Sequence, residues 1–330
     1  FSMKILVTGG AGFIGSNLVK RLVQLGFDVF VADNLWKGKT ENLHENGHPV
    51  IDLDSRFHQF DLRDYKNCLV ANKGMDVVIH LADIVAGINF VFANELFLYR
   101  ANIIINSNML DAAINNNVKK YIYVGTACSY PAEMQSELNP PPFKEEDAYP
   151  ANPESAYGWS KLMGEYECGL AQQESAIKIG ILRLHNVYGA PCEMSPEKSQ
   201  VIPALCRKAI NYPEGEFIVW GSGDQRRAFL YVDDAVDAIV ATLGKGMNKG
   251  VIQIGPGESF SIADIAEKIV AISGKDIDIK FDQTMPEGDK DRTADSSKAR
   301  KILGWQKKVS IDDGLERTYT WANDYLEKKR

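Results

Sequence analysis

The sequence predicts an α/β protein with a doubly wound parallel sheet and a smaller, mixed α/β second lobe. Short apolar runs alternate with helix-like stretches through the first half of the 330 residues. These runs are strongly apolar, as expected for strands that helices cover on both faces. Near residue 186 the regular alternation of strands and helices ends, and prolines at 191, 196, 203 and 213 divide the chain into short helices and loops.

The elements of the first half follow in order from these runs. Residues 14–25 have helical spacing and follow the first strand. Repeated strand–helix units with right-handed crossovers wind helices onto both faces of one sheet. The predicted strands are residues 5–7, 29–32, 57–60, 77–81 and 121–124.

The second half predicts the smaller lobe. Residues 217–220 and 251–254 are expected to form strands outside the main sheet, and 261–273 and 311–328 to form helices. The last of these helices has apolar residues spaced by three and four, which indicates one buried face. We therefore expect a first domain over 1–186, to which 226–247 return, and a second domain over 187–330.

Composition excludes several classes of function. The net charge of −7 argues against a nucleic-acid partner, since phosphate backbones bind basic faces. No apolar stretch approaches the roughly 20 residues of a membrane span. The five cysteines are odd in number, widely spaced and without a CxxC pair, so we expect no disulfide framework and no metal site. Met3-Lys4 leads straight into a strand, so we expect no signal peptide and a cytoplasmic protein.

A glycine-rich turn joins the first strand to the first helix. Gly9, Gly12 and Gly15 are spaced GxxGxxG, with Phe13 and Ile14 between the last two. The first glycine permits a tight turn, the second lets a pyrophosphate approach the backbone, and the third lets helix and strand pack closely. The anion then lies at the helix N-terminus. This arrangement predicts a dinucleotide cofactor in a Rossmann domain.

Asp33 at the end of the second strand selects the cofactor. Its carboxylate is placed to accept from ribose hydroxyls and would repel a 2′-phosphate, which favours NAD over NADP. Further cofactor contacts are expected at Asp61 and Leu62, just beyond the third strand, and at Leu81 and Ala82, where the fourth strand ends.

Tyr157 and Lys161 are four residues apart, which places them on one face of a helix. A lysine ammonium lowers the pKa of a nearby phenol, so Tyr157 is expected to take a hydroxyl proton while a hydride leaves to NAD. Thr126, at the end of the fifth strand, is expected to hydrogen-bond the reacting oxygen. Its alternative is a strand-end cap.

These motifs, together with Leu184-His-Asn-Val-Tyr-Gly189, resemble the extended short-chain dehydrogenase/reductases that modify nucleotide sugars. The resemblance extends to residues 225–234 and 295–305, and so covers essentially the whole chain. It implies that residues 1–186 bind NAD and that 187–330 bind a nucleotide-diphosphate sugar. It also implies a homodimer through helices near 94–116 and 155–173. The substrate contacts that it suggests are Asn186, Arg227 and Arg292, since the arginine fork suits phosphate.

The residues after Thr126 distinguish members of this family. Dehydratases carry Asp-Glu there, whereas this chain has Ala127 and Cys128, which disfavours a 4,6-dehydratase. A cysteine at this position resembles two groups of the family. In the GDP-mannose 3,5-epimerases its partner is a lysine, and in the GDP-fucose synthases its partner is a histidine. Lys198 falls where that lysine would lie. The resemblance implies that Cys128 and Lys198 form a base and acid that invert carbons 3 and 5 beside a transient carbon 4 ketone.

Several alternatives stay open. The chain would also suit a 4-epimerase, a 4-dehydrogenase, an epimerase-reductase or a non-catalytic NAD-binding sensor. Cys128 has the alternative of a small buried apolar residue, and Lys198 that of a solvated charge or a phosphate contact. Residues 83–88 depart from the Ala-Asp-Met-Gly-Gly-Met of the 3,5-epimerases, so the identity of the sugar stays open. Asp83 in this loop has no explanation from the sequence.

Overall fold

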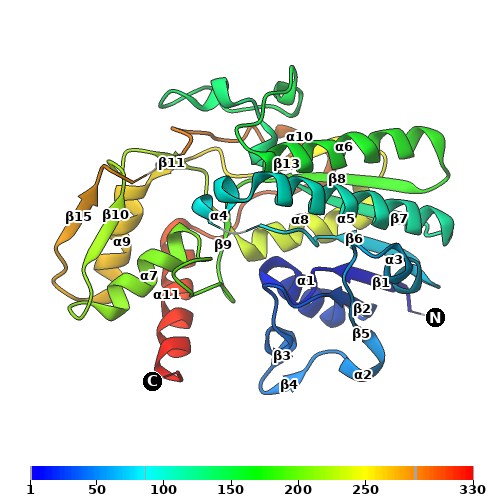
Figure 1. The fold of residues 1–330 in the computed structure, drawn as a ribbon, viewed down its shortest axis with the longest axis horizontal. Helices are drawn as coiled ribbons and strands as arrows, with labels where there is room; N and C mark the ends of the chain where they lie inside the picture. Colours follow the sequence, from blue (N-terminus) through cyan, green and yellow to red (C-terminus); the bar gives the residue numbers. More distant parts are fainter. Residues whose placement is uncertain (1, 86, 286–287, 330) are drawn as a thin grey trace.

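The computed structural model describes residues 2–85, 87–285 and 288–329. Within these residues, the central sheet has seven parallel strands in the order β13-β8-β7-β6-β1-β2-β5 (Figure 1). The predicted doubly wound sheet is confirmed. The strands are β1 (Lys4–Thr8), β2 (Asp28–Asp33), β5 (Phe57–Gln59), β6 (Val77–His80), β7 (Lys120–Thr126), β8 (Lys178–Leu184) and β13 (Val251–Ile254).

Helices cover both faces of this sheet (Figure 1). One layer contains α3 (Tyr65–Asn72), α5 (Glu95–Asn115) and α6 (Ala156–Glu174), and the other contains α1 (Phe13–Gln24) and α8 (Val232–Lys245). Along β1, Ile5 and Val7 pack into the core on the α1 side, while Leu6 packs into the core under α5. Burial on both faces explains why the strands are mostly apolar rather than alternating between apolar and polar residues.

A smaller lobe lies to the left in Figure 1. It contains α7 (Val201–Asn211), α9 (Ile262–Ser273), α11 (Ile311–Glu327) and the parallel pair β10 (Phe217–Trp220) and β15 (Ile279–Asp282). The remaining short elements are α2 (Leu53–Arg56), α4 (Ile88–Ala93), α10 (Ser297–Leu303), β3 (His44–Glu45), β4 (His48–Pro49), β9 (Val187–Tyr188), β11 (Arg226–Arg227), β12 (Leu230–Tyr231), β14 (Phe260–Ser261) and the 3₁₀ turns η1 (Thr40–Leu43), η2 (Ala127–Ser129), η3 (Ala132–Gln135) and η4 (Glu145–Ala148).

The prediction that residues 251–254 lie outside the main sheet is wrong. They form β13, which pairs in parallel with β8, with Ile252 beside Leu182. A run this short, with three apolar residues and Gln253, carries no local signal of the sheet that it joins. Here α10 packs against β13 and holds it at the sheet edge. The sheet therefore takes one strand from beyond residue 186.

The strand order reverses between β1 and β6, because β2 and β5 continue to one side and β7, β8 and β13 to the other. In open parallel sheets, ligands bind at the carboxyl ends of the strands flanking this reversal. No helix of the described residues is long and apolar enough to cross a bilayer.

Candidate active site

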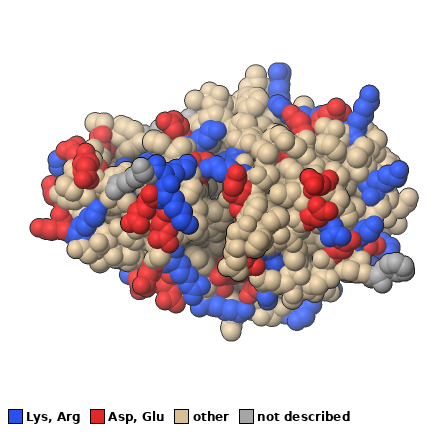
Figure 2. Space-filling model, turned by 90° about the horizontal axis from the view of Figure 1, so that it is seen from below, with Lys and Arg blue, Asp and Glu red and all other residues tan. Residues whose placement is uncertain are grey.

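A cavity of about 1210 Å³ opens at the strand reversal. Figure 2, seen from below, shows a central hollow in this surface, with acidic and basic side chains interspersed around it. The cavity exceeds the roughly 300–1,000 Å³ of a typical small-molecule site, so it has room for a dinucleotide and a second ligand. Its walls include the predicted residues Gly9, Gly12, Phe13, Ile14, Gly15, Asp33, Asp61, Leu62, Leu81, Ala82, Thr126, Cys128, Tyr157, Lys161, Asn186, Arg227 and Arg292.

The glycine turn is held by close backbone contacts. Gly9 has a φ of +67°, and a Cβ there would lie 3.0 Å from the backbone of Ala82. A Cβ on Gly15 would lie 2.1 Å from the Gly9 carbonyl oxygen. Gly12 precedes α1 and gives it no side-chain cap, and the first residues of the helix line the cavity. This cradle fits a pyrophosphate at the helix N-terminus.

Asp33 ends β2 beside this cradle. Its Oδ2 accepts from the Ala11 amide at 3.0 Å and its Oδ1 from the Leu35 amide at 2.8 Å. Burial raises the pKa of Asp33, while the two amides act in the opposite direction. Asp61 also reaches the cavity, but its carboxylate is paired with Arg63, whose Nη2 lies 2.6 Å from Oδ2. These residues fit an NAD adenosine, with Asp33 better placed to accept from it than Asp61.

Tyr157 and Lys161 both contact Asp83. The Tyr157 hydroxyl donates to Asp83 Oδ2 at 3.1 Å, and Lys161 Nζ lies 3.3 Å from the same oxygen. The pKa of Tyr157 is raised well above its usual value, first by burial and then by the charge of Asp83. The sequence predicts a lowered pKa for this phenol. The direction differs because burial, above all, and then the Asp83 carboxylate disfavour the phenolate.

Thr126 ends β7 and begins η2. Its Oγ1 accepts from the Cys128 amide at 3.3 Å, so the hydroxyl caps the turn that carries the cysteine. Both side chains line the cavity. The strand-end cap is therefore present, and the position beside the cavity also suits contact with a ligand oxygen.

Arg292 contacts both Cys128 and Asn186. Its Nη2 lies 3.7 Å from the Cys128 sulfur and 3.5 Å from Asn186 Oδ1, while Nη1 lies 3.0 Å from Asp289 Oδ2. A guanidinium in contact with sulfur stabilises a thiolate. Arg227 is half-buried beside it, and burial, with the neighbouring Arg292, lowers its pKa to about 10. Two mutually repelling guanidiniums form a site suited to an anion.

The glycine cradle, Asp33 and the Tyr157–Lys161 pair thus border one cavity. Residues 5–255 match the model of the NAD dependent epimerase/dehydratase family. This chain belongs to that family. It is therefore an enzyme, and its cofactor is NAD.

Individual members of the family are similar over almost their whole length. The GDP-mannose 3,5-epimerase of Arabidopsis thaliana is 33% identical over 330 residues, which is 100% of this chain and 84% of that protein. GDP-L-fucose synthase 1 of the same plant is 30% identical, over 97% of this chain and 93% of its own. The crystal structure of UDP-glucose 4-epimerase with UDP-glucose from Thermotoga maritima has a TM-score of 0.87 and 29% identity, over 98% of this chain and 100% of its own.

Lys198 stands apart from the other predicted site residues of this epimerase/dehydratase. Its Nζ lies 5.0 Å from the centroid of the Trp36 ring, and among the described residues its neighbours Glu197 and Ser199 line the cavity while Lys198 does not. A cation–π contact of this kind contributes only about 0.5–1 kcal/mol at an exposed site.

His185 has a structural contact in this member of the family. Its Nε2 lies 3.0 Å from Gln253 Oε1, and burial lowers its pKa to about 3. It is therefore neutral at pH 7 and connects β8 to β13 across the sheet.

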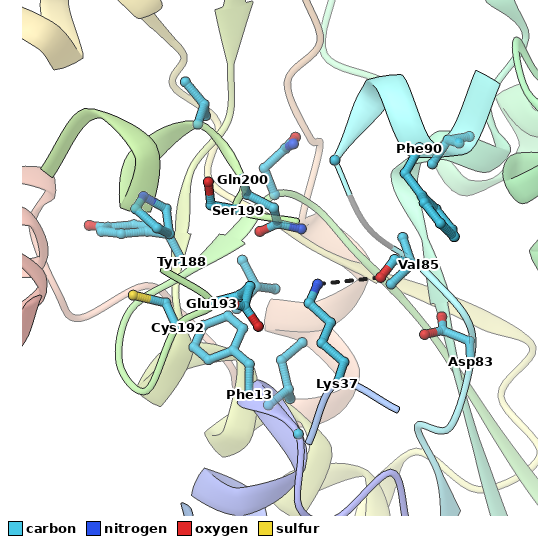
Figure 3. A pocket seen from close by; sticks show the side chains of 18 of the residues that line it. Phe13, Lys37, Asp83, Val85, Phe90, Tyr188, Cys192, Glu193, Ser199 and Gln200 are labelled. Atoms are coloured by element: carbon cyan, nitrogen blue, oxygen red, sulfur yellow. Dashed lines mark hydrogen bonds between the residues drawn. The ribbon is translucent and has the colours of Figure 1, made fainter. Parts of the chain in front are cut away.

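Sequence reasoning missed two charged groups on the cavity wall. Figure 3 shows Lys37 extending between Glu193 and the segment of Asp83 and Val85, and its Nζ donates to the Val85 carbonyl at 3.3 Å. Burial lowers the pKa of Lys37 and raises that of Glu154 to about 7, where a hydrogen bond with Asp289 acts in the same direction. Their spacing was the available signal, since Lys37 lies four residues after Asp33 and Glu154 three before Tyr157.

Proposed function

We propose that this enzyme is a nucleotide-sugar epimerase that oxidises its sugar at carbon 4, inverts carbon 3, carbon 5 or both, and then reduces carbon 4 again. One observation carries the proposal. Cys128 and the Tyr157–Lys161 pair border the same cavity, and Arg292 contacts the cysteine sulfur. Similarity to the GDP-mannose 3,5-epimerase of Arabidopsis thaliana supports it.

The first domain, residues 1–186 with 226–247, would hold the cofactor through the glycine cradle and Asp33. When bound there, NAD accepts a hydride from the sugar and later returns it. Tyr157 would take the carbon 4 hydroxyl proton, and Thr126 would hydrogen-bond the same oxygen. The ammonium of Lys161 would stabilise the negative charge of the neighbouring Asp83 carboxylate.

The ketone at carbon 4 makes the hydrogens on carbons 3 and 5 acidic, because the resulting enolate is delocalised. Cys128 as a thiolate would remove one of these protons, and Arg292 would stabilise that thiolate. The acid on the opposite face would be Lys198, after its ammonium leaves the Trp36 ring. Glu154, with a pKa of about 7, is a second proton donor on the wall.

The second domain, residues 187–330, would hold the nucleotide sugar. Arg227 and Arg292 suit the diphosphate, since their guanidinium groups donate to paired phosphate oxygens. Asn186 lies 3.5 Å from Arg292 and would complete this contact. We further infer a homodimer through α5 and α6, which carry exposed apolar side chains.

A second candidate is a 4-epimerase, 4-dehydrogenase or epimerase-reductase. The position of Lys198 over Trp36 favours it, because chemistry confined to carbon 4 requires Tyr157 and Lys161 but no acid–base pair at carbons 3 and 5. The similarities to GDP-L-fucose synthase 1 and UDP-glucose 4-epimerase agree with this candidate. A non-catalytic NAD sensor is disfavoured by the assembled Tyr157–Lys161 pair.

Incubation of the enzyme with GDP-mannose, GDP-L-fucose and UDP-glucose in deuterated water separates these functions. Deuterium at carbon 3 or 5 without net consumption of NAD is the expected result. The Cys128→Ser variant should lose that label yet still form NADH on adding the sugar, and Tyr157→Phe should lose both. Stoichiometric NADH release, or inversion at carbon 4 without label, would replace the proposal by the second candidate.

A further inference from the structure

Asp83 lies between the two residues of the hydride chemistry. Its Oδ2 is 3.1 Å from the Tyr157 hydroxyl and 3.3 Å from Lys161 Nζ. The site is enclosed, since the side chains of Asp83 and Lys161 are only 13% and 3% exposed. One carboxylate oxygen therefore accepts from the phenol and forms an ion pair with the ammonium, away from bulk water.

The direction of these hydrogen bonds limits what Tyr157 can do. An ammonium only donates and a carboxylate only accepts, so the phenol proton points at Asp83. Lone pairs of the phenol oxygen are then left to accept a proton from a hydroxyl in the cavity, which Tyr157 lines. Tyr157 can receive one proton and release another along a single path.

We propose that Asp83 is the final proton acceptor in the oxidation of carbon 4, receiving the proton of Tyr157 as Tyr157 receives that of the sugar hydroxyl. This inference rests on the proposed function. The hydroxyl O–H bond breaks and its proton binds the phenol oxygen. The original phenol proton moves to Asp83 Oδ2, and the carbon 4 hydrogen leaves as hydride for NAD. Reduction reverses each transfer.

A relay suits this site because it avoids a phenolate. Burial first, and then the Asp83 carboxylate, raise the pKa of Tyr157 well above its usual value. A resting phenolate would place two negative oxygens 3.1 Å apart. In the relay the phenol stays neutral, and the negative charge is held by the carboxylate before the transfer. Asp83 acts on the sugar only through Tyr157, so it is a positioning residue.

The titratable groups around Asp83 and Tyr157 come from five segments. Lys161 lies on α6, His80 on β6, Tyr123 on β7, Cys128 on η2 and Lys37 in the loop after β2. Burial lowers the pKa of His80 to about 4, so it is neutral at pH 7. The pKa of Tyr123 is raised by burial, so it is neutral as well. Asp83 therefore faces two lysines.

The first test needs no substrate. Ultraviolet titration of tyrosine ionisation is run on the enzyme and on Asp83→Asn, each against the same protein carrying Tyr157→Phe, so that the other tyrosines are subtracted. Loss of the carboxylate should lower the pH of Tyr157 ionisation by at least about one unit. Glu193→Gln, which removes another carboxylate from the same cavity wall, should leave it unchanged. Equal titration of Tyr157 with and without Asp83 would overturn the proposal.

The second test follows the hydride step by NADH absorbance in a single turnover across pH 6–9. With Asp83 the rate should be nearly independent of pH. In Asp83→Asn it should fall about 100-fold at pH 7 and rise tenfold per pH unit, because the phenol must then ionise. A flat profile at the normal rate in Asp83→Asn would reject the relay. Failure of the unsubstituted enzyme with every nucleotide sugar would reject the proposed function, and the titration would still decide for or against the contact of Asp83 with Tyr157.

Discussion

His80 Nδ1 lies 2.7 Å from the Thr8 hydroxyl, and this contact determines the tautomer of a buried histidine. Thr8 Oγ1 already accepts from the amides of Leu81 and Ala82, each at 3.2 Å, so its own proton goes to Nδ1. His80 Nε2 therefore carries the ring proton and donates to Asn106 Oδ1 at 3.0 Å.

The same network reaches the helix that bears the catalytic pair. Asn106 Nδ2 donates to the Tyr123 hydroxyl at 3.3 Å, and Tyr123 donates to the Lys161 carbonyl at 3.1 Å. A chain of buried hydrogen bonds thus runs from the strand before the glycine cradle to α6. Such networks are worth most when every member is satisfied.

The network predicts a loss of stability in acid. Burial lowers the pKa of His80 from 6.5 to about 4, so the unfolded chain binds a proton that the folded protein excludes. This contribution is complete above pH 6.5 and declines as pH falls toward 4. Urea unfolding from pH 7.5 to 4.5 should show His80→Asn with a slope against pH reduced by up to about 1.4 kcal/mol per unit. His48→Asn, at an exposed site, is the control, and equal slopes in the two variants would contradict this assignment.

Gly15→Ala should weaken both NAD binding and folding. The added Cβ would lie 2.1 Å from the Gly9 carbonyl oxygen, so the turn that receives the pyrophosphate must move. Overpacking of this kind destabilises by about 1–3 kcal/mol, and we expect NAD affinity to fall at least about tenfold. Calorimetric titration and thermal melting measure the two effects. Gly244→Ala in α8, where a Cβ meets nothing within 4 Å, should leave NAD affinity unaltered.

The identity of the proton donor can be decided by two substitutions. Lys198→Met should lower deuterium incorporation at carbons 3 and 5 about 100-fold while NADH formation at carbon 4 persists. Glu154→Gln should change that incorporation by no more than about threefold, because an amide keeps the size of the side chain and the donor is elsewhere. Mass spectrometry of the recovered sugar measures the label. If the two variants ranked in the opposite order, the donor would be Glu154.

The proposed dimer predicts that Leu96→Glu produces a monomer. Leu96 is 63% exposed on α5, and Tyr166 is 56% exposed on the adjoining α6. A charge placed among apolar side chains that pack together in a dimer is left without solvation. Light scattering after size-exclusion chromatography gives the mass. Val70→Glu, 56% exposed on α3, is the matched control, and a monomeric unsubstituted protein would refute the dimer.

Short-range pattern was enough to predict a Rossmann fold that uses NAD. The glycine turn, Asp33 and the Tyr157–Lys161 pair depend on spacings within one strand–turn–helix or one helix, and the structure places all of them on one cavity wall. The helix at 311–328 was predicted for the same reason, since an amphipathic period is a local property.

Contacts between distant segments were decided only by the tertiary structure. The edge position of β13 depends on the packing of α10, and Arg292 reaches Cys128 across 164 residues of chain. Lys198 looked like the partner of Cys128 in sequence, yet the fold places it over Trp36. Asp83 was only an unexplained carboxylate until β6 and α6 brought it to Tyr157. The physical reason is that spacing along the chain specifies the turns and faces of each element, whereas the distance between charges on different elements is set by how those elements pack.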